Sequence, residues 1–260
     1  MSLIGLLARQ FLQVVDVPEI CGAAILLFVF TKTGKYDGLM YLLFLTMLYN
    51  AILKHMFKWP LPETCPGHGY GFPSGHTNFM TVFYVWIVVV NKNFILRFVV
   101  VVLWITSIIS LVLAGYHYHI DVILAVPFSI FSIVLYKCAY RKLGARKTIS
   151  IVIWSATAFL LILYGIEGTI RTYMAIAYGA IIGLSAPLSI FSLSDGWKLN
   201  AKIGMDCVFG LTIFAVLLMS SGTSSAVYLL SNFKFTMQFA LIGVVKLATG
   251  VCLEKCVEKV

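Results

Sequence analysis

Long apolar runs separated by short polar connectors set the pattern of this 260-residue chain. A membrane-spanning helix needs about 20 mostly apolar residues, and nine runs meet that length or come close to it. They cover residues 19–32, 38–57, 76–91, 95–115, 120–138, 148–166, 170–192, 204–221 and 226–251. We therefore expect an all-α fold, a polytopic transmembrane helical bundle of about nine spans.

The first 18 residues follow a different rhythm, because polar side chains interrupt the apolar ones at helical spacing. Residues 1–18 are therefore predicted to form an interfacial amphipathic helix. The connector at 137–147, KCAYRKLGARK, divides the rest of the chain. We expect residues 19–140 to form a core of five spans that holds the unusual polar residues, and residues 141–260 to add four further spans.

The composition supports a membrane protein. Hydrophobic residues make up 61% of the chain and charged residues only 11%, with a mean hydropathy of +0.98, which is more apolar surface than one soluble core of this size can bury. The net charge of +9 resides in short connectors, so it indicates topology and lipid headgroup contacts and not nucleic-acid binding. The six cysteines show no CxxC pairing, and no cofactor or metal site is predicted.

Basic residues in short connectors favour the cytoplasmic side of a membrane. The strongest such marker is residues 137–147, with five Lys and Arg side chains. Counting spans from it predicts a cytoplasmic C-terminus, and it brings the loop at 58–74 and the turn at 116–119 together on the opposite, periplasmic or lumenal, face.

The segment FPSGHT lies at the start of one predicted span. Pro73 and Gly75 interrupt the chain there, so the backbone amides around Ser74, Gly75 and His76 open a helix N-terminus. Such a terminus binds anions through its free N–H groups and its dipole. The sequence therefore predicts an anion site at this position.

The segment GYHYHID lies at the start of the predicted span at residues 120–138. His117 and Asp121 are four residues apart, so on a helix they share a face and the carboxylate can orient the imidazole. A histidine nucleophile, a second histidine as proton donor and an orienting carboxylate would together form and break a phosphohistidine. His117 and His76 are the candidates for these two roles.

The order Lys54, then PSGH ending at His76, then His117 and Asp121 resembles the type 2 phosphatidic acid phosphatase (PAP2) superfamily. Its pattern is K-x₆-R-P, P-S-G-H and S-R-x₅-H-x₃-D, and the match covers residues 54–121. The resemblance implies that His117 attacks phosphorus, that Asp121 holds it and that His76 protonates the leaving oxygen. It also assigns phosphate binding to Lys54, Ser74 and the Gly75 amide. The nine spans resemble the glucose-6-phosphatase branch.

Two positions depart from the family pattern. Leu61 and Leu111 stand where the family has its phosphate-binding arginines, and the five arginines of the chain fall outside the motifs. Arginine forks are the usual ligands of a doubly charged phosphate monoester, so the site suits a less charged phosphodiester. The stretches SGHT at 74–77 and HYHIDV at 117–122 are also similar to sphingomyelin synthases, which transfer a lipid headgroup.

Other polar and aromatic residues near the motifs have simpler interpretations. His55, His68 and His119 are interpreted as loop, packing or headgroup contacts, and Lys54 could be a lysine that only extends toward the interface. The aromatic residues near the site indicate an interfacial belt or the lining of a lipid entrance: Trp59, Tyr70 and Phe72.

The sequence thus leaves three hypotheses. The first is a membrane-embedded enzyme that hydrolyses or transfers the phosphoryl group of a lipid or lipid-linked phosphate. The second is a sphingomyelin-synthase-like headgroup transferase acting on a phosphodiester. The third is a catalytically silent relative that binds lipid, scaffolds a partner or transports a solute.

Overall fold

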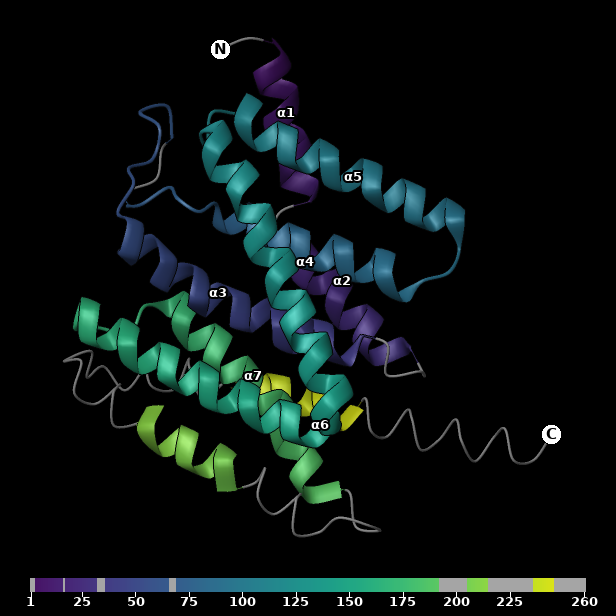
Figure 1. The fold of residues 1–260 in the computed structure, drawn as a ribbon, viewed down its shortest axis with the longest axis vertical. Coiled ribbons are helices and arrows are strands. Elements are labelled where there is room, and N and C mark those ends of the chain that lie inside the picture. Colours follow the sequence, from purple (N-terminus) through teal and green to yellow (C-terminus); the bar gives the residue numbers. More distant parts are fainter. Residues whose placement is uncertain are drawn as a thin grey trace. The chain divides into compact units, whose positions relative to one another are not determined.

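The computed structural model describes residues 3–15, 17–31, 36–65, 69–191, 205–214 and 236–245, and within them the fold is all-helical, as predicted. The named helices are α1 (Leu3–Val14), α2 (Val17–Phe30), α3 (Asp37–Phe57), α4 (Gly75–Val90), α5 (Phe94–Leu113), α6 (His119–Glu167) and α7 (Thr172–Phe191) (Figure 1). Two shorter helices follow, Met205–Phe214 and Thr236–Val245.

Four apolar helical stretches are long enough to cross a membrane: Leu3–Phe30, Asp37–Phe57, Phe94–Leu113 and His119–Glu167. The other apolar helical stretches are 10–17 residues long: Gly75–Val90, Thr172–Ala186 (the part of α7 whose side chains the structure describes), Met205–Phe214 and Thr236–Val245. The chain is therefore a multi-pass membrane protein by length and composition. The count of nine spans stays a prediction, and parts of its last three runs lie outside the described residues.

Helix α6 consists of two helices that meet at a kink at Gly144, which has φ 79° and ψ 169°. Only glycine adopts such a conformation without a steric penalty from a Cβ atom. The break falls inside the basic connector at 137–147, so the predicted spans at 120–138 and 148–166 lie on its two sides. Each part of α6 has about the length of one membrane crossing.

The chain divides into two compact units. The first unit comprises residues 1–24 and 49–135, and the second comprises residues 25–48 and 136–260. All six predicted site residues belong to the first unit. The division into residues 1–18, 19–140 and 141–260 that the sequence suggests stays a prediction.

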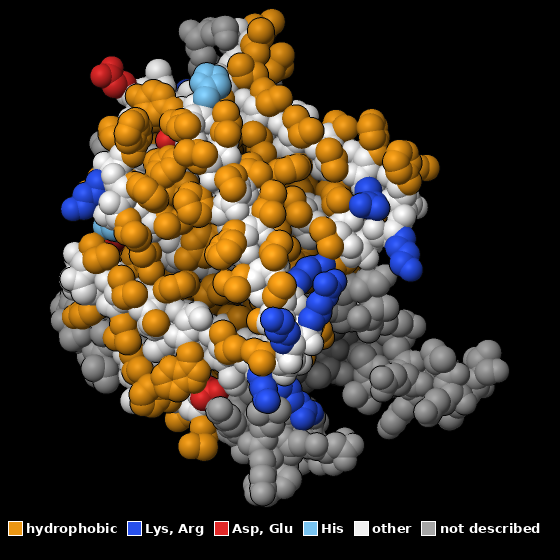
Figure 2. Space-filling view, in the orientation of Figure 1, with side chains coloured by type: hydrophobic (Ala, Val, Ile, Leu, Met, Phe, Trp, Pro, Cys, Tyr) orange, Lys and Arg blue, Asp and Glu red, His pale blue; other side chains and the backbone are white. Residues whose placement is uncertain are grey.

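Within the first unit, α5 packs against both α4 and α1 (Figure 1). The indole N–H of Trp104 on α5 donates to the hydroxyl of Thr81 on α4 at 3.0 Å. The rest of α5 exposes large apolar side chains, such as Phe94, Ile95 and Phe98. Figure 2 shows hydrophobic side chains covering most of the visible face, the pattern expected of a surface that meets lipid.

The second unit is held by close apolar packing and by isolated polar pairs. Tyr178 is fully buried, and its hydroxyl hydrogen-bonds that of Thr157 at 2.9 Å. The rings of Phe44 and Phe239 meet edge to face at 5.1 Å. At Gly183 there is no room for a Cβ atom, which would collide with the backbone carbonyl of Thr236.

Candidate functional site

The first half of the site is the N-terminus of α4. Ser74 caps this helix: its Oγ accepts from the Thr77 amide at 3.3 Å and from the Thr77 hydroxyl at 3.0 Å. Ser74 and Thr77 are both fully buried. The cap begins the helix at Gly75 and takes up the Thr77 amide, and the dipole of the helix favours an anion at this N-terminus.

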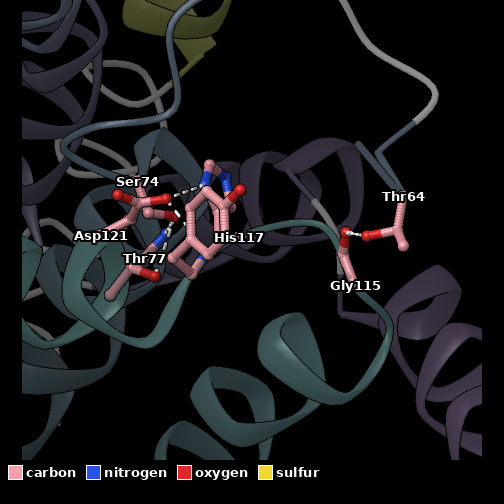
Figure 3. Close-up of polar contacts among 7 residues, drawn as sticks. Thr64, Ser74, Thr77, Gly115, His117 and Asp121 are labelled. Carbon is pink, nitrogen blue, oxygen red and sulfur yellow. Dashed lines mark hydrogen bonds and ion pairs between the residues drawn. The ribbon is translucent and has the colours of Figure 1, made fainter. Parts of the chain in front are cut away.

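The second half is the turn that joins α5 to α6. His117 is 6% exposed and Asp121 is fully buried, and His117 Nδ1 lies 3.5 Å from Asp121 Oδ2 (Figure 3). The Tyr118 amide donates to that same oxygen at 3.1 Å and fixes the carboxylate. The structure therefore brings His117 and Asp121 together, as their spacing suggests, although His117 precedes the helix and only Asp121 lies in its first turn.

The two halves meet directly. The Ser74 amide donates to the backbone carbonyl of Asp121 at 3.1 Å, and the ring centres of His76 and His117 are 6.2 Å apart. His76 is half-buried at the start of α4, next to the cap. Figure 3 shows Ser74, Thr77, His117 and Asp121 gathered in one place. Both segments predicted to share a membrane face thus contribute to one cluster.

Two polar atoms of this cluster have no hydrogen-bond partner among the described residues, His117 Nδ1 and Asp121 Oδ1. A buried polar atom without a partner costs roughly 1–3 kcal/mol. The 3.5 Å separation of Nδ1 and Oδ2 is also longer than a hydrogen bond. Catalytic contacts often have such lengths without substrate and tighten when substrate binds.

Lys54 and Gly75 complete the predicted set. Lys54 is half-buried in the last turn of α3, and its charge interacts with that of Asp121. At Gly75, a Cβ atom would lie 2.9 Å from the amide nitrogen of Asn50, so glycine permits α4 to approach α3 closely. The structure therefore brings all six predicted residues into the same region of the first unit.

The two leucines at the arginine positions lie in different settings. The Leu61 backbone borders the site: a Cβ built on Gly71 would be 3.3 Å from Leu61 Cα and 3.1 Å from Asp121 Oδ2. Leu111 is 1% exposed, and its carbonyl accepts from the Tyr116 amide at 3.1 Å. The Leu61 backbone therefore lies near the carboxylate, across Gly71, whereas Leu111 is part of the packed end of α5.

Sequence reasoning missed a buried polar network beneath the site. The Ser129 hydroxyl donates to Asn78 Oδ1 at 2.7 Å, and the Asn78 amide donates to Asn50 Oδ1. All three residues are buried, and they tie α6, α4 and α3 together. Their signal was present in the sequence, because each is a polar residue inside an apolar run, where an unpaired amide would be costly.

An open hollow of about 630 Å³ lies beside the site, lined by Trp59, Pro60, Tyr118, His119 and Ile120. His119 is exposed, in agreement with its interpretation as a contact residue, while His55 Nδ1 lies 2.9 Å from the Ala51 carbonyl and its ring meets Tyr70 edge to face. His68 lies outside the described residues. Within the described ranges, no three His, Cys, Asp or Glu side chains converge as metal ligands.

Comparison with protein families finds a match over part of the chain. Residues 36–145 match the PAP2 superfamily, and this range contains every residue of the predicted site. Searches of the curated proteins and of the solved structures find no match.

Proposed function

From the PAP2 superfamily domain at residues 36–145, whose relatives are typically phosphatases, we propose that this chain is a membrane-embedded enzyme. It hydrolyses or transfers the phosphoryl group of a lipid or lipid-linked phosphate through a phosphohistidine intermediate. One observation carries the proposal: His117 with Asp121, His76 and the N-terminus of α4 converge in one buried cluster.

Nδ1 of His117 faces Asp121, so Nε2 is the nitrogen that attacks. In the first step the Nε2–P bond forms, the bond from phosphorus to the leaving oxygen breaks, and His76 gives its proton to that oxygen. Asp121 stabilises the charge that develops on the His117 ring. In the second step His76 takes a proton from water or from an acceptor hydroxyl, whose oxygen bonds to phosphorus as the Nε2–P bond breaks.

The phosphate oxygens are bound by the N-terminus of α4, through the Gly75 amide and the Ser74 hydroxyl, and by the ammonium group of Lys54. The family pattern has an arginine at the position of Leu61, near Asp121, so this site has one cation fewer than the pattern implies. A singly charged phosphodiester loses less binding energy from the missing cation than a doubly charged monoester does. This observation favours a second candidate, the transfer of a headgroup from one lipid to another.

The hollow beside the site supports a substrate with a bulky organic group. Its lining is mainly apolar and aromatic, and Tyr118 and His119 directly follow the nucleophile in the chain. Pro60, which lines the hollow, is also near the site. A Cβ atom built on Gly71 would lie 3.1 Å from the Pro60 carbonyl oxygen and 3.1 Å from Asp121 Oδ2, so Gly71 lies between the two residues. We place the organic group of the substrate in this hollow, with entry from the bilayer.

The membrane arrangement belongs to the same proposal. The site lies on the non-cytoplasmic face, the C-terminus is cytoplasmic, and α1 forms the interfacial helix of residues 1–18. Basic residues at 137–147 support this orientation.

A lipid panel assayed for both free phosphate and headgroup transfer tests the proposal. His117→Ala and His76→Ala should each lose all activity while remaining folded in detergent, and full turnover in either variant would refute the mechanism. Free phosphate identifies a hydrolase, and a headgroup on an added acceptor lipid identifies a transferase. Vanadate, which mimics the transition state at histidine, should protect the wild type but not His117→Ala from unfolding; no protection would favour a silent relative.

A further inference from the structure

The His117 ring is held loosely by its own side-chain contacts. It faces Asp121 at 3.5 Å, and its Nδ1 has no hydrogen-bond partner among the described residues. The ring projects from the loop at residues 114–118, which joins the end of α5 to the start of α6. Its placement must therefore depend on how the backbone of that loop is fixed.

One anchor of the loop comes from α1, 105 residues away in sequence. Arg9 donates to the carbonyl of Ala114 through Nε at 3.2 Å and Nη2 at 3.1 Å, and its guanidinium lies 5.4 Å from the centre of the Tyr116 ring. Ala114 caps the C-terminus of α5, where carbonyls lack intrahelical partners and carry partial negative charge. A cation whose two donors converge on one carbonyl oxygen suits this position.

The second anchor comes from the loop at residues 58–74, which precedes α4. The Thr64 hydroxyl donates to the carbonyl of Gly115 at 2.8 Å (Figure 3). Gly115 has φ 76°, and a Cβ atom there would lie 2.9 Å from the Thr64 oxygen. Glycine is thus needed both for the backbone conformation and for the approach of Thr64. The adjacent carbonyls of Ala114 and Gly115 therefore accept hydrogen bonds from two different segments of the chain.

We propose that Arg9 and Thr64 are positioning residues that hold the His117 loop in its reactive geometry, which makes α1 part of the catalytic apparatus. The kinetic part of this inference rests on the proposed function, whereas the anchoring of the loop does not. Displacement of a reacting group by about 1 Å can cost about 100-fold in rate, so loss of one of two anchors should be costly. Neither residue needs to touch the substrate.

The test uses the full chain in detergent with Arg9→Gln and Thr64→Val. Each should lower kcat about tenfold and leave KM within about twofold, because the reacting group moves while the phosphate and lipid sites stay intact. Amide hydrogen exchange at residues 114–118 should rise severalfold, with exchange in α4 unchanged. Arg97→Gln and Thr106→Val are matched controls on exposed positions of α5, and both should behave as wild type.

The measurements separate the two parts of the inference. Unchanged exchange at 114–118 overturns the anchoring, and raised exchange with an unchanged kcat overturns the catalytic role. If Arg9→Gln does not fold, Arg9→Lys and Thr64→Val decide the matter; Arg9→Lys keeps the charge without the double donor and should give intermediate values. A wild-type protein inactive on every lipid refutes the proposed function, and hydrogen exchange then still decides the anchoring.

Discussion

Each unit of the molecule contains a buried aspartate, and the two are built into different surroundings. Asp121 in the first unit is fully buried, faces His117, accepts from the Tyr118 amide and interacts with the charge of Lys54. Asp206 in the second unit is 7% exposed and accepts from the indole N–H of Trp154 at 3.1 Å. Each has one oxygen without a hydrogen-bond partner among the described residues.

The comparison shows that a buried carboxylate alone does not define a site. Burial and an unpartnered oxygen are common to both aspartates, so these features carry no functional information here. The distinguishing features of Asp121 are two histidines within reach of one another, a lysine and the N-terminus of α4. Function is therefore assigned from the group of neighbours that surrounds the carboxylate.

The largest expected effect comes from exchanging each aspartate for its neutral isostere. Asp121→Asn should lower turnover by about 10³-fold or more, because an amide cannot stabilise the charged His117 ring. Asp206→Asn keeps an oxygen acceptor for Trp154 and should leave turnover within about threefold of wild type. Initial rates on the best substrate of the lipid panel measure both, and equal losses would remove the distinction between the units.

A second contrast concerns two glycines at close helix contacts. Gly183→Ala should lower the free energy of unfolding by about 1–3 kcal/mol, because its new methyl group meets the Thr236 backbone, which cannot easily move. Gly75→Ala meets the end of the Asn50 side chain, so the strain should fall on the site and reduce activity more than stability. Thermal unfolding in detergent, paired with turnover, gives both values. A Gly183→Ala protein of wild-type stability would contradict the packing described for the second unit.

The smallest effect sharpens the description of the site itself. Leu61→Arg restores a cation beside Asp121, whereas Leu111 is too deeply buried for a charge to be introduced without a folding cost. We expect Leu61→Arg to raise the ratio of monoester to diester turnover by about fivefold, as one added charge contact contributes on the order of 1 kcal/mol. Leu61→Met is the matched uncharged control. A fall in both activities would show that Leu61 serves packing and does not set specificity.

The sequence predicted the parts of the site that are local. The four-residue spacing placed His117 near Asp121, and the break at Pro73 and Gly75 placed a helix N-terminus beside Ser74. Counting the predicted spans brought both segments to one face, and the structure joins them in one cluster; the side of the membrane stays a prediction. These features depend on chain geometry within a few residues and on the length of a span, which a single sequence contains.

The parts it did not predict depend on contacts between distant segments. No periodicity links Arg9 to Ala114, and the sequence interpretation excluded the arginines because they lie outside the motifs. The network of Asn50, Asn78 and Ser129 was visible only as single polar residues in apolar runs. Pairing them requires the packing of three helices, and that packing is set by side-chain shape and volume across the unit.

The cap at Ser74 has a consequence for what its hydroxyl can offer to a bound group. A serine hydroxyl has one proton and two lone pairs, and the lone pairs of Ser74 are directed to the amide and the hydroxyl of Thr77. Both lone pairs are therefore used, and the Ser74 hydroxyl can interact with a ligand only as a hydrogen-bond donor. A protonated phosphate oxygen would find no acceptor there. The same contact that starts helix α4 thus leaves this hydroxyl as a donor, so a group bound at this atom must present an acceptor to it.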